Sequence, residues 1–247
     1  MKIKNHLSTF GFVGFIFIQS SCSVYTSQNP PPVLIESKKE IEISGGASIS
    51  PVLWNPGLNA SFSYGISNKI QAQLYGSLIF PILNNGKNGT SHIQGCIGYS
   101  VFSNNSYSFK TFAGYFHGTS NIEFPNLQGL ENNFKGNYNS IFGQSQLTVK
   151  KDAYYYGCIL KVGDFNSIEK VNLSNTDIKD KGLLIEPSIF YSRHFNGNLK
   201  LNLSYSYSFL NIKRYSNNYN NNFHFNNPYG NLGIAIIYTI SKKRNQQ

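Results

Sequence analysis

Apolar and small polar residues alternate along the chain from about Ile41 onward, and this period of two constrains the fold more than any other feature. Between Leu199 and Phe209, for example, Leu, Tyr and Phe take every other position, with Lys, Asn and Ser between them. Because successive side chains of a strand point to opposite faces, each such segment has one apolar and one polar face. The ten segments that we identify cover residues 40–50, 57–66, 69–82, 91–103, 106–119, 137–150, 153–165, 181–195, 198–212 and 228–241. Each reaches the roughly 9–11 residues that a tilted strand needs to cross a bilayer.

The joins between these segments alternate in length. Two-residue joins, which close tight hairpins, occur at 67–68, 104–105, 151–152 and 196–197, and the last of them is Asn-Gly. Longer joins rich in Asn and Gly occur at about 51–56, 83–90, 120–136, 166–180 and 213–227. This order predicts an all-β, up-and-down antiparallel barrel of about ten strands with both chain ends on the short-turn side. Short turns of outer-membrane barrels face the periplasm, so we expect both termini to be periplasmic.

Alternation alone does not say which face is outside, because a soluble barrel of the lipocalin type has the same period with an apolar interior. The polar face here consists mainly of Ser, Gly, Gln and Asn, and only 13% of the residues are charged, unlike a soluble exterior. About five apolar residues from each strand would also overfill a lumen of this size. We therefore predict a transmembrane β-barrel over residues 41–241. A lipid-anchored periplasmic ligand-binding barrel is the alternative.

Six tyrosines lie on the predicted apolar face, near the short-turn ends of their strands. They are Tyr64, Tyr99, Tyr107, Tyr154, Tyr191 and Tyr238. We expect them to form an aromatic girdle at one membrane interface. The simpler explanation of such positions is the ordinary strand propensity of Tyr. Phe80, Tyr115 and Phe209 lie near the long-loop ends and are candidates for a second girdle.

The first 21 residues have the pattern of an export signal. Basic residues precede the apolar stretch 10–18, which is too short to span a bilayer, and two serines precede Cys22. A Cys that follows small residues at this distance resembles the lipobox of bacterial lipoproteins. We expect residues 1–21 to be a lipoprotein-type signal peptide and Cys22 to be acylated, with ordinary signal-peptidase cleavage nearby as the alternative.

Residues 22–40 have the composition of a periplasmic tether. Prolines at 30–32 favour an extended conformation, and the charged run 36–40 keeps the segment hydrated. The Cys, the Pro-containing segment, the apolar patch 33–35, the charged run and the alternating first strand together resemble the small outer-membrane barrel lipoproteins of Bacteroidota. This resemblance covers nearly the whole chain. It implies a location and a fold, and no biochemical activity.

The chain is basic, with a formal net charge of +10. Its basic residues are scattered rather than clustered with aromatic residues on one face, so we do not expect nucleic-acid binding. Positions at strand ends and in the tail 242–247, which we expect to be periplasmic, favour contact with outer-membrane lipid and lipopolysaccharide by Coulomb attraction to their phosphates. Solubility of the turns is an equally simple reason for these charges.

Charges of both signs face the predicted lumen, namely Glu42, Lys110, Lys161, Glu186 and Lys200. Since unpaired buried charge is costly, we expect a hydrogen-bonded plug rather than a conduction path. A barrel of this size is also far narrower than the barrels of about 16 strands that hold an aqueous channel.

Two further predictions concern single residues. Cys96 is expected to face the lumen and Cys158 the lipid, so the two should not form a disulfide. Pro187 lies within a predicted strand and cannot donate to the ladder, which predicts a bulge or a missing hydrogen bond there.

The residue pattern offers little catalytic chemistry. Strand parity sends His92 inward and His117 outward, so the two cannot share a metal, and we predict no metal site, no cofactor and no catalytic residue. Asp164, Glu169, Asp177 and Asp180 surround one long join, and a rim hydrolase acting on lipid or protein is the enzyme alternative.

We predict a non-enzymatic outer-membrane barrel lipoprotein with a structural or surface-interaction role, carried by Asn-rich extracellular loops. The candidate contact residues are Tyr219, Phe223 and Phe225 in the join 213–227, for a surface ligand that the sequence does not name. A disordered polar loop is the simpler explanation of that join. A small-solute pore is the remaining alternative.

Overall fold

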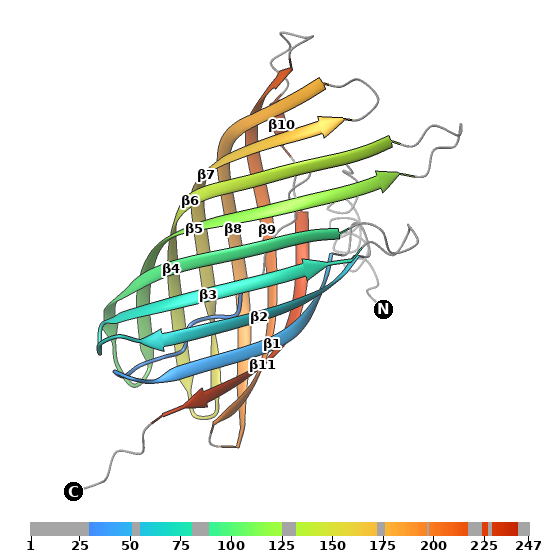
Figure 1. Cartoon of the computed structure of the whole chain (residues 1–247). Coiled ribbons are helices and arrows are strands. Elements are labelled where there is room, and N and C mark those ends of the chain that lie inside the picture. Colours follow the sequence, from blue (N-terminus) through green and yellow to red (C-terminus); the bar gives the residue numbers. More distant parts are fainter. Residues whose placement is uncertain are drawn as a thin grey trace, which may run out of the picture.

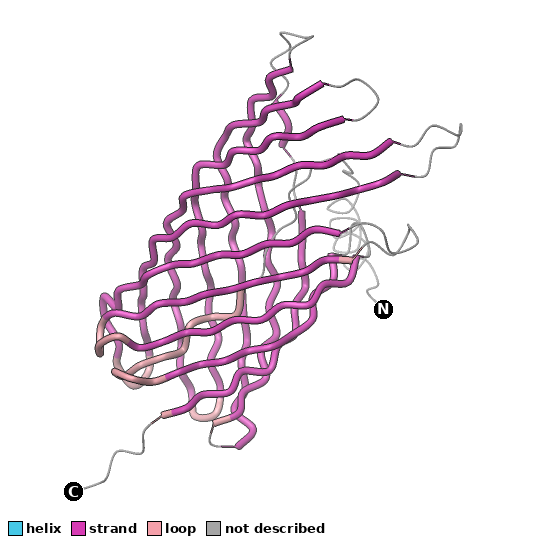
Figure 2. Tube along the Cα trace, viewed as in Figure 1, coloured by secondary structure: helices cyan, strands magenta, loops and turns pink. Residues whose placement is uncertain are grey.

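The computed structural model describes residues 30–50, 55–80, 89–124, 132–171, 176–196, 198–216, 224–226 and 229–241. Nearly all of them lie in strands (Figures 1 and 2). The strands are β1 (Ile41–Ser50), β2 (Asn55–Gly65), β3 (Ile70–Ile79), β4 (Gly89–Ser103), β5 (Tyr107–Phe124), β6 (Asn132–Lys151), β7 (Tyr154–Val171), β8 (Thr176–Asn196), β9 (Leu199–Ser216), β10 (His224–Asn226) and β11 (Tyr229–Ile240). The residues that the structure describes include no helix long and apolar enough to span a membrane.

The strands form one closed antiparallel barrel. Each strand from β1 to β9 pairs with the next, β11 pairs with both β9 and β1, and the predicted ten-stranded meander is thereby confirmed. The short strand β10 pairs with β9 in the same register as β11, so it continues the line of β11. Closure leaves the main strands without free edges, as a stable barrel requires.

The apolar face of the sheet lies outside. One apolar side chain from each barrel strand illustrates this: Ile43, Phe62, Leu74, Ile97, Tyr115, Ile141, Leu160, Ile189, Leu203 and Ile236 are 44–73% exposed. The alternate positions, rich in Ser, Gln, Asn and Thr, are buried inside. An apolar exterior around a polar interior is the arrangement of a membrane-spanning barrel. The alternative of a soluble barrel with an apolar ligand cavity is therefore wrong.

These outward apolar residues form a band around the barrel, here named the apolar band. On β5 it extends from Tyr107 to Tyr115, and on β11 from Leu232 to Ile240. Each segment has about nine residues, which matches the roughly 9–11 residues of a membrane-crossing strand. The band thus has the height of a hydrocarbon core.

Strands β5 to β9 continue beyond the apolar band on the long-loop side, and we name this part the outer extension (Figure 1). Its outward positions are mostly polar or charged. They include His117, Asn139, Asp164, Lys181 and Asn211, which lie directly beyond the apolar band on their strands, whereas Ile168 of β7 is an exposed apolar exception. The predicted loops 120–136 and 166–180 are therefore wrong in extent, because strand pairing persists to Phe124 and Val171.

The short turns lie within one or two residues of the predicted positions. For example, β6 and β7 are joined through Asp152, which has a positive φ of 50°. At Pro187 the ladder between β8 and β9 is interrupted: Ile185 pairs with Phe209 and Ser188 with Ser206, with no pairing between. Register is the same on both sides, so the proline removes a hydrogen bond without producing a bulge.

Candidate functional site

The lumen contains a piece of the chain itself. Residues 30–36, here named the N-terminal segment, run from the short-turn end into the barrel (Figure 2). Val33, Leu34 and Ile35 are buried there, with 0, 5 and 3% of their surface exposed. The predicted hydrated tether over 22–40 is thus wrong for residues 30–35. Residues 22–29 lie outside the described part of the chain.

Polar side chains of the barrel wall hold the backbone of the N-terminal segment. Lys110 donates from Nζ to the carbonyl oxygens of Val33 (3.0 Å) and Ile35 (2.5 Å). Gln146 donates from Nε2 to the Val33 carbonyl (3.0 Å) and accepts the Val33 N–H at Oε1 (3.1 Å). Glu42 accepts the Leu34 N–H (2.8 Å). An extended segment has unpaired backbone groups, and these bonds satisfy them where water is excluded.

A tight crossing fixes the place where the segment enters the barrel. The backbones of Lys39 and Glu40 exchange hydrogen bonds with Gly65 at the end of β2. A Cβ added at Gly65 would lie 2.2 Å from the carbonyl oxygen of Ser37, so only glycine allows this close approach. Glu36 forms an ion pair with Lys150 of β6 at the same end. The sequence does not predict this arrangement, because a patch of three apolar residues has no strand period.

Four of the five charged residues predicted in the lumen form two ion pairs. Lys161 lies 2.9 Å from Glu186, and Lys200 lies 2.9 Å from Glu42. Glu42 thereby connects Lys200 with the N-terminal segment. Paired and hydrogen-bonded charges are the only kind that a low-dielectric interior tolerates cheaply. The prediction of a hydrogen-bonded plug is confirmed for these residues.

An apolar cluster fills the lumen next to the N-terminal segment, and strand parity did not predict this cluster. Its members include Phe112, Phe116, Tyr138, Phe142, Phe165, Leu184 and Leu210, and Val33 and Ile35 of the N-terminal segment contact it. Lys161 lies over the rings of Phe116 and Phe142, at 5.7 and 5.3 Å from their centres. Aromatic side chains at these inward positions occupy space that water would need in a channel.

The histidines and acids expected at the rim are not gathered into one site. His92 is buried inside, with its ring 4.9 Å from that of Phe116, whereas His117 faces outward. Asp164 also faces outward, whereas Glu169 and Asp180 are buried on the inner side of the outer extension. Within the described ranges, no three His, Cys, Asp or Glu side chains are close enough to hold a metal ion.

Both described cysteines are free thiols, Cys96 buried and Cys158 exposed, which confirms that they do not pair. The six tyrosines of the predicted girdle all lie on the outer side of their strands, close to the short turns. The rings of Tyr154 and Tyr191 are 5.9 Å apart, and the guanidinium of Arg193 lies 5.5 Å from the centre of the Tyr154 ring. Their place at a membrane interface stays a prediction.

Other predicted residues are only partly covered by the structure. Cys22, the tail 242–247, Tyr219 and Phe223 lie outside the described residues. Phe225 lies in β10, where its backbone is opposite Ile212 of β9. The join 213–227 therefore contains a short paired strand rather than a loop throughout.

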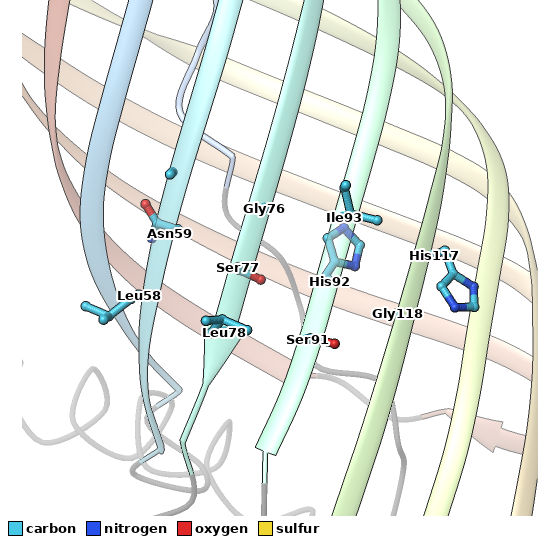
Figure 3. Close-up of a pocket in the computed structure, with 11 residues that line it drawn as sticks. Leu58, Asn59, Gly76, Ser77, Leu78, Ser91, His92, Ile93, His117 and Gly118 are labelled. Carbon is cyan, nitrogen blue, oxygen red and sulfur yellow. The ribbon is translucent and has the colours of Figure 1, made fainter.

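The outer face carries a hollow of about 440 Å³, here named the lower hollow (Figure 3). It lies across β2 to β5, where Gly76 leaves a gap among the outward side chains of Leu58, Leu78, Ile93 and His117. A second hollow of about 320 Å³, the upper hollow, lies across the outer extension. It is lined by Gly89, Thr119, Ser120, Asn121, Lys135, Gly136, Asn137, Ile168 and Lys170.

No family model matches the sequence, and no curated protein matches it. Among solved structures, the chain is similar to the outer membrane protein OprG from Pseudomonas aeruginosa, with 12% identity over 84% of this chain and 100% of that one and a TM-score of 0.40. It is also similar to Ail, the attachment invasion locus protein of Yersinia pestis (10% identity, 82% and 99% covered, TM-score 0.39). Outer membrane phospholipase A from Escherichia coli matches with 8% identity (81% and 92% covered, TM-score 0.34). Similarities this low do not indicate a shared function.

Proposed function

We propose that the protein is a non-conducting, non-enzymatic outer-membrane barrel that supports the hairpins of its outer extension at the cell surface. The observation that carries this proposal is the filled lumen, in which the N-terminal segment, two ion pairs and an aromatic cluster occupy the interior. A barrel with such an interior is a rigid support rather than a passage. The function of the protein would then depend on the parts of the chain beyond the apolar band.

The location and the anchor belong to the same proposal. Short turns on the side where β1 begins and β11 ends favour a periplasmic position for that side, and they leave the outer extension outside the cell. Acylation of Cys22 would hold the chain a second time, as in the barrel lipoproteins of Bacteroidota that the sequence resembles. The apolar band supports insertion into a bilayer independently of that lipid.

Single-channel recording in planar lipid bilayers tests this function. We expect the full-length protein to insert without unit current steps at moderate voltage, because the aromatic cluster and the N-terminal segment exclude water from the interior. Insertion is checked separately by the heat-modifiable gel mobility of the same preparation. Reproducible current steps from inserted protein would overturn the proposal and favour the small-solute pore.

The enzyme alternative has less support. Hydrolysis at the rim would need a nucleophile or base next to a second polar group. His92 and His117 face opposite sides of the sheet, and the ring of His92 lies among aromatic side chains. Release of fatty acid from phospholipid vesicles by the purified protein, abolished in a His117→Ala variant, would revive this alternative.

A further inference from the structure

The two outer hollows adjoin each other. His117 of the lower hollow and Thr119 of the upper hollow are consecutive outward residues of β5. Ser91, which lines the lower hollow, shares a hydrogen bond of 2.7 Å with the Thr119 hydroxyl. The hollows therefore lie next to each other along β4 and β5, across the edge of the apolar band, and we name the two together the depression.

The lower part of this depression is shaped for a hydrocarbon chain. Leu58, Leu78 and Ile93 are 52–58% exposed and border it, with Gly76 between them (Figure 3). Ala60 also lines it. A Cβ added at Gly76 would meet only the His92 carbonyl oxygen, at 3.7 Å, so the space above this residue is open. In a bilayer, an acyl chain would fill such a space.

The upper part is basic. Lys135 of β6 and Lys170 of β7 lie directly opposite each other across the two strands, and both are exposed on the outer face. Like charges in directly opposite positions destabilise a sheet. Within the described residues no ion pair joins either lysine to an acid. In the strand register, the only acidic residue directly opposite either lysine is Asp177 of β8, which is opposite Lys170.

The remaining lining groups of the upper hollow are hydrogen-bonding ones. Thr119, Asn121 and Asn137 offer a hydroxyl and two amides around the lysine pair. A phosphate bound between the lysines would relieve their repulsion, and the hydroxyl and amides would bind sugar hydroxyls next to it.

We propose that this depression binds one molecule of a phosphorylated glycolipid of the lipid A type. One acyl chain lies in the lower hollow, and a phosphate lies between Lys135 and Lys170. This inference rests on the proposed function, because it needs the outer extension to be at the leaflet that contains such a lipid. It adds a defined lipid site to the general attraction between a basic rim and anionic lipid.

The charge arm of the test uses two double variants of the full-length protein in detergent. Lys135→Gln/Lys170→Gln removes the proposed phosphate site, whereas Lys181→Gln/Lys213→Gln removes another directly opposed lysine pair of the outer extension and the same net charge. We expect binding of fluorescent lipid A to weaken at least tenfold in the first variant and less than twofold in the second. Equal weakening in both would mean general surface charge and would overturn the site.

The acyl arm uses two glycines of the outer face. Gly76→Leu fills the lower hollow, whereas Gly95→Leu adds the same side chain at an outward position with open space around it and outside both hollows. We expect only Gly76→Leu to weaken lipid A binding. Equal affinities in the two variants would overturn the acyl position.

Competition identifies the ligand class. Inorganic phosphate and the deacylated sugar phosphate should each displace lipid A far less effectively than unlabelled lipid A does. If inorganic phosphate competes equally, the depression is a site for free phosphate and the lipid proposal is wrong. Heat-modifiable mobility and the bilayer recordings report on the proposed function separately, so a failure of either proposal is recognised on its own.

Discussion

Lys110 shows at the scale of one residue how this barrel is filled. The residue is 3% exposed, and its ammonium group donates hydrogen bonds to two backbone carbonyls of the N-terminal segment and to Gln71. Hydrogen bonds from a charged donor contribute about 1.5–3 kcal/mol each when their partners are present. The segment and the lysine therefore stabilise each other, because either alone would leave polar groups unsatisfied in the interior.

Replacement of this ammonium should loosen the N-terminal segment. In Lys110→Met we expect backbone amides of residues 33–36 to exchange with deuterium about 10- to 100-fold faster, as the loss of about 1.5–3 kcal/mol implies. Hydrogen-exchange mass spectrometry of the protein in detergent measures this rate. The control is Lys161→Met/Glu186→Gln, which removes a buried pair elsewhere in the lumen. Unchanged protection in Lys110→Met would show that the segment is held by its apolar side chains alone.

At the scale of the element, alternation predicted the strands well where the sheet crosses the apolar band. It failed beyond the band, because the segments around Thr119, Lys135 and Lys170 show no regular alternation of apolar and polar residues. The upper hollow could not be predicted for the same reason, because Lys135 lies within one of the predicted loops. The N-terminal segment was missed because prolines and charges around Val33 indicated a hydrated tether, and its burial depends on distant partners such as Lys110 and Gln146.

The interruption of the ladder between β8 and β9 at Pro187 should lower the stability of the barrel. Pro187 has no N–H to donate, and strand pairing with β9 is absent at Glu186 and Pro187. In Pro187→Val a backbone N–H becomes available for the ladder, and the outward side chain stays apolar. We expect a gain of about 0.5–1.5 kcal/mol in the free energy of unfolding, the usual net contribution of one hydrogen bond. Urea unfolding of the detergent-folded barrel measures it, and a loss of stability would mean that the proline conformation itself is required there.

At the scale of the whole molecule, two features could each keep the protein in a membrane. The apolar band surrounds the barrel with exposed Ile, Leu, Phe and Tyr side chains over about nine residues of each strand, close to the 9–11 residues that span a bilayer. An acyl chain on Cys22 would add about 0.8 kcal/mol for each buried methylene. The band surrounds the whole circumference of the barrel, whereas the lipid would act at one point. We therefore expect the band to contribute more to membrane retention than the lipid does.

Removal of the acylation site separates the two anchors. In Cys22→Ala we expect the protein to stay in outer membranes that are washed with alkaline carbonate, and to change its gel mobility on boiling as folded barrels do. The wild-type protein and a soluble periplasmic protein in the same membranes are the controls for retention and release. Release of the variant would mean that the lipid was the only anchor. We do not expect this result, because Ile97, Ile141 and Ile189 of the apolar band are exposed on the outside of the barrel. Retention with heat-modifiable mobility would mean that the barrel itself spans the bilayer, and that any lipid on Cys22 restrains the chain ahead of the N-terminal segment.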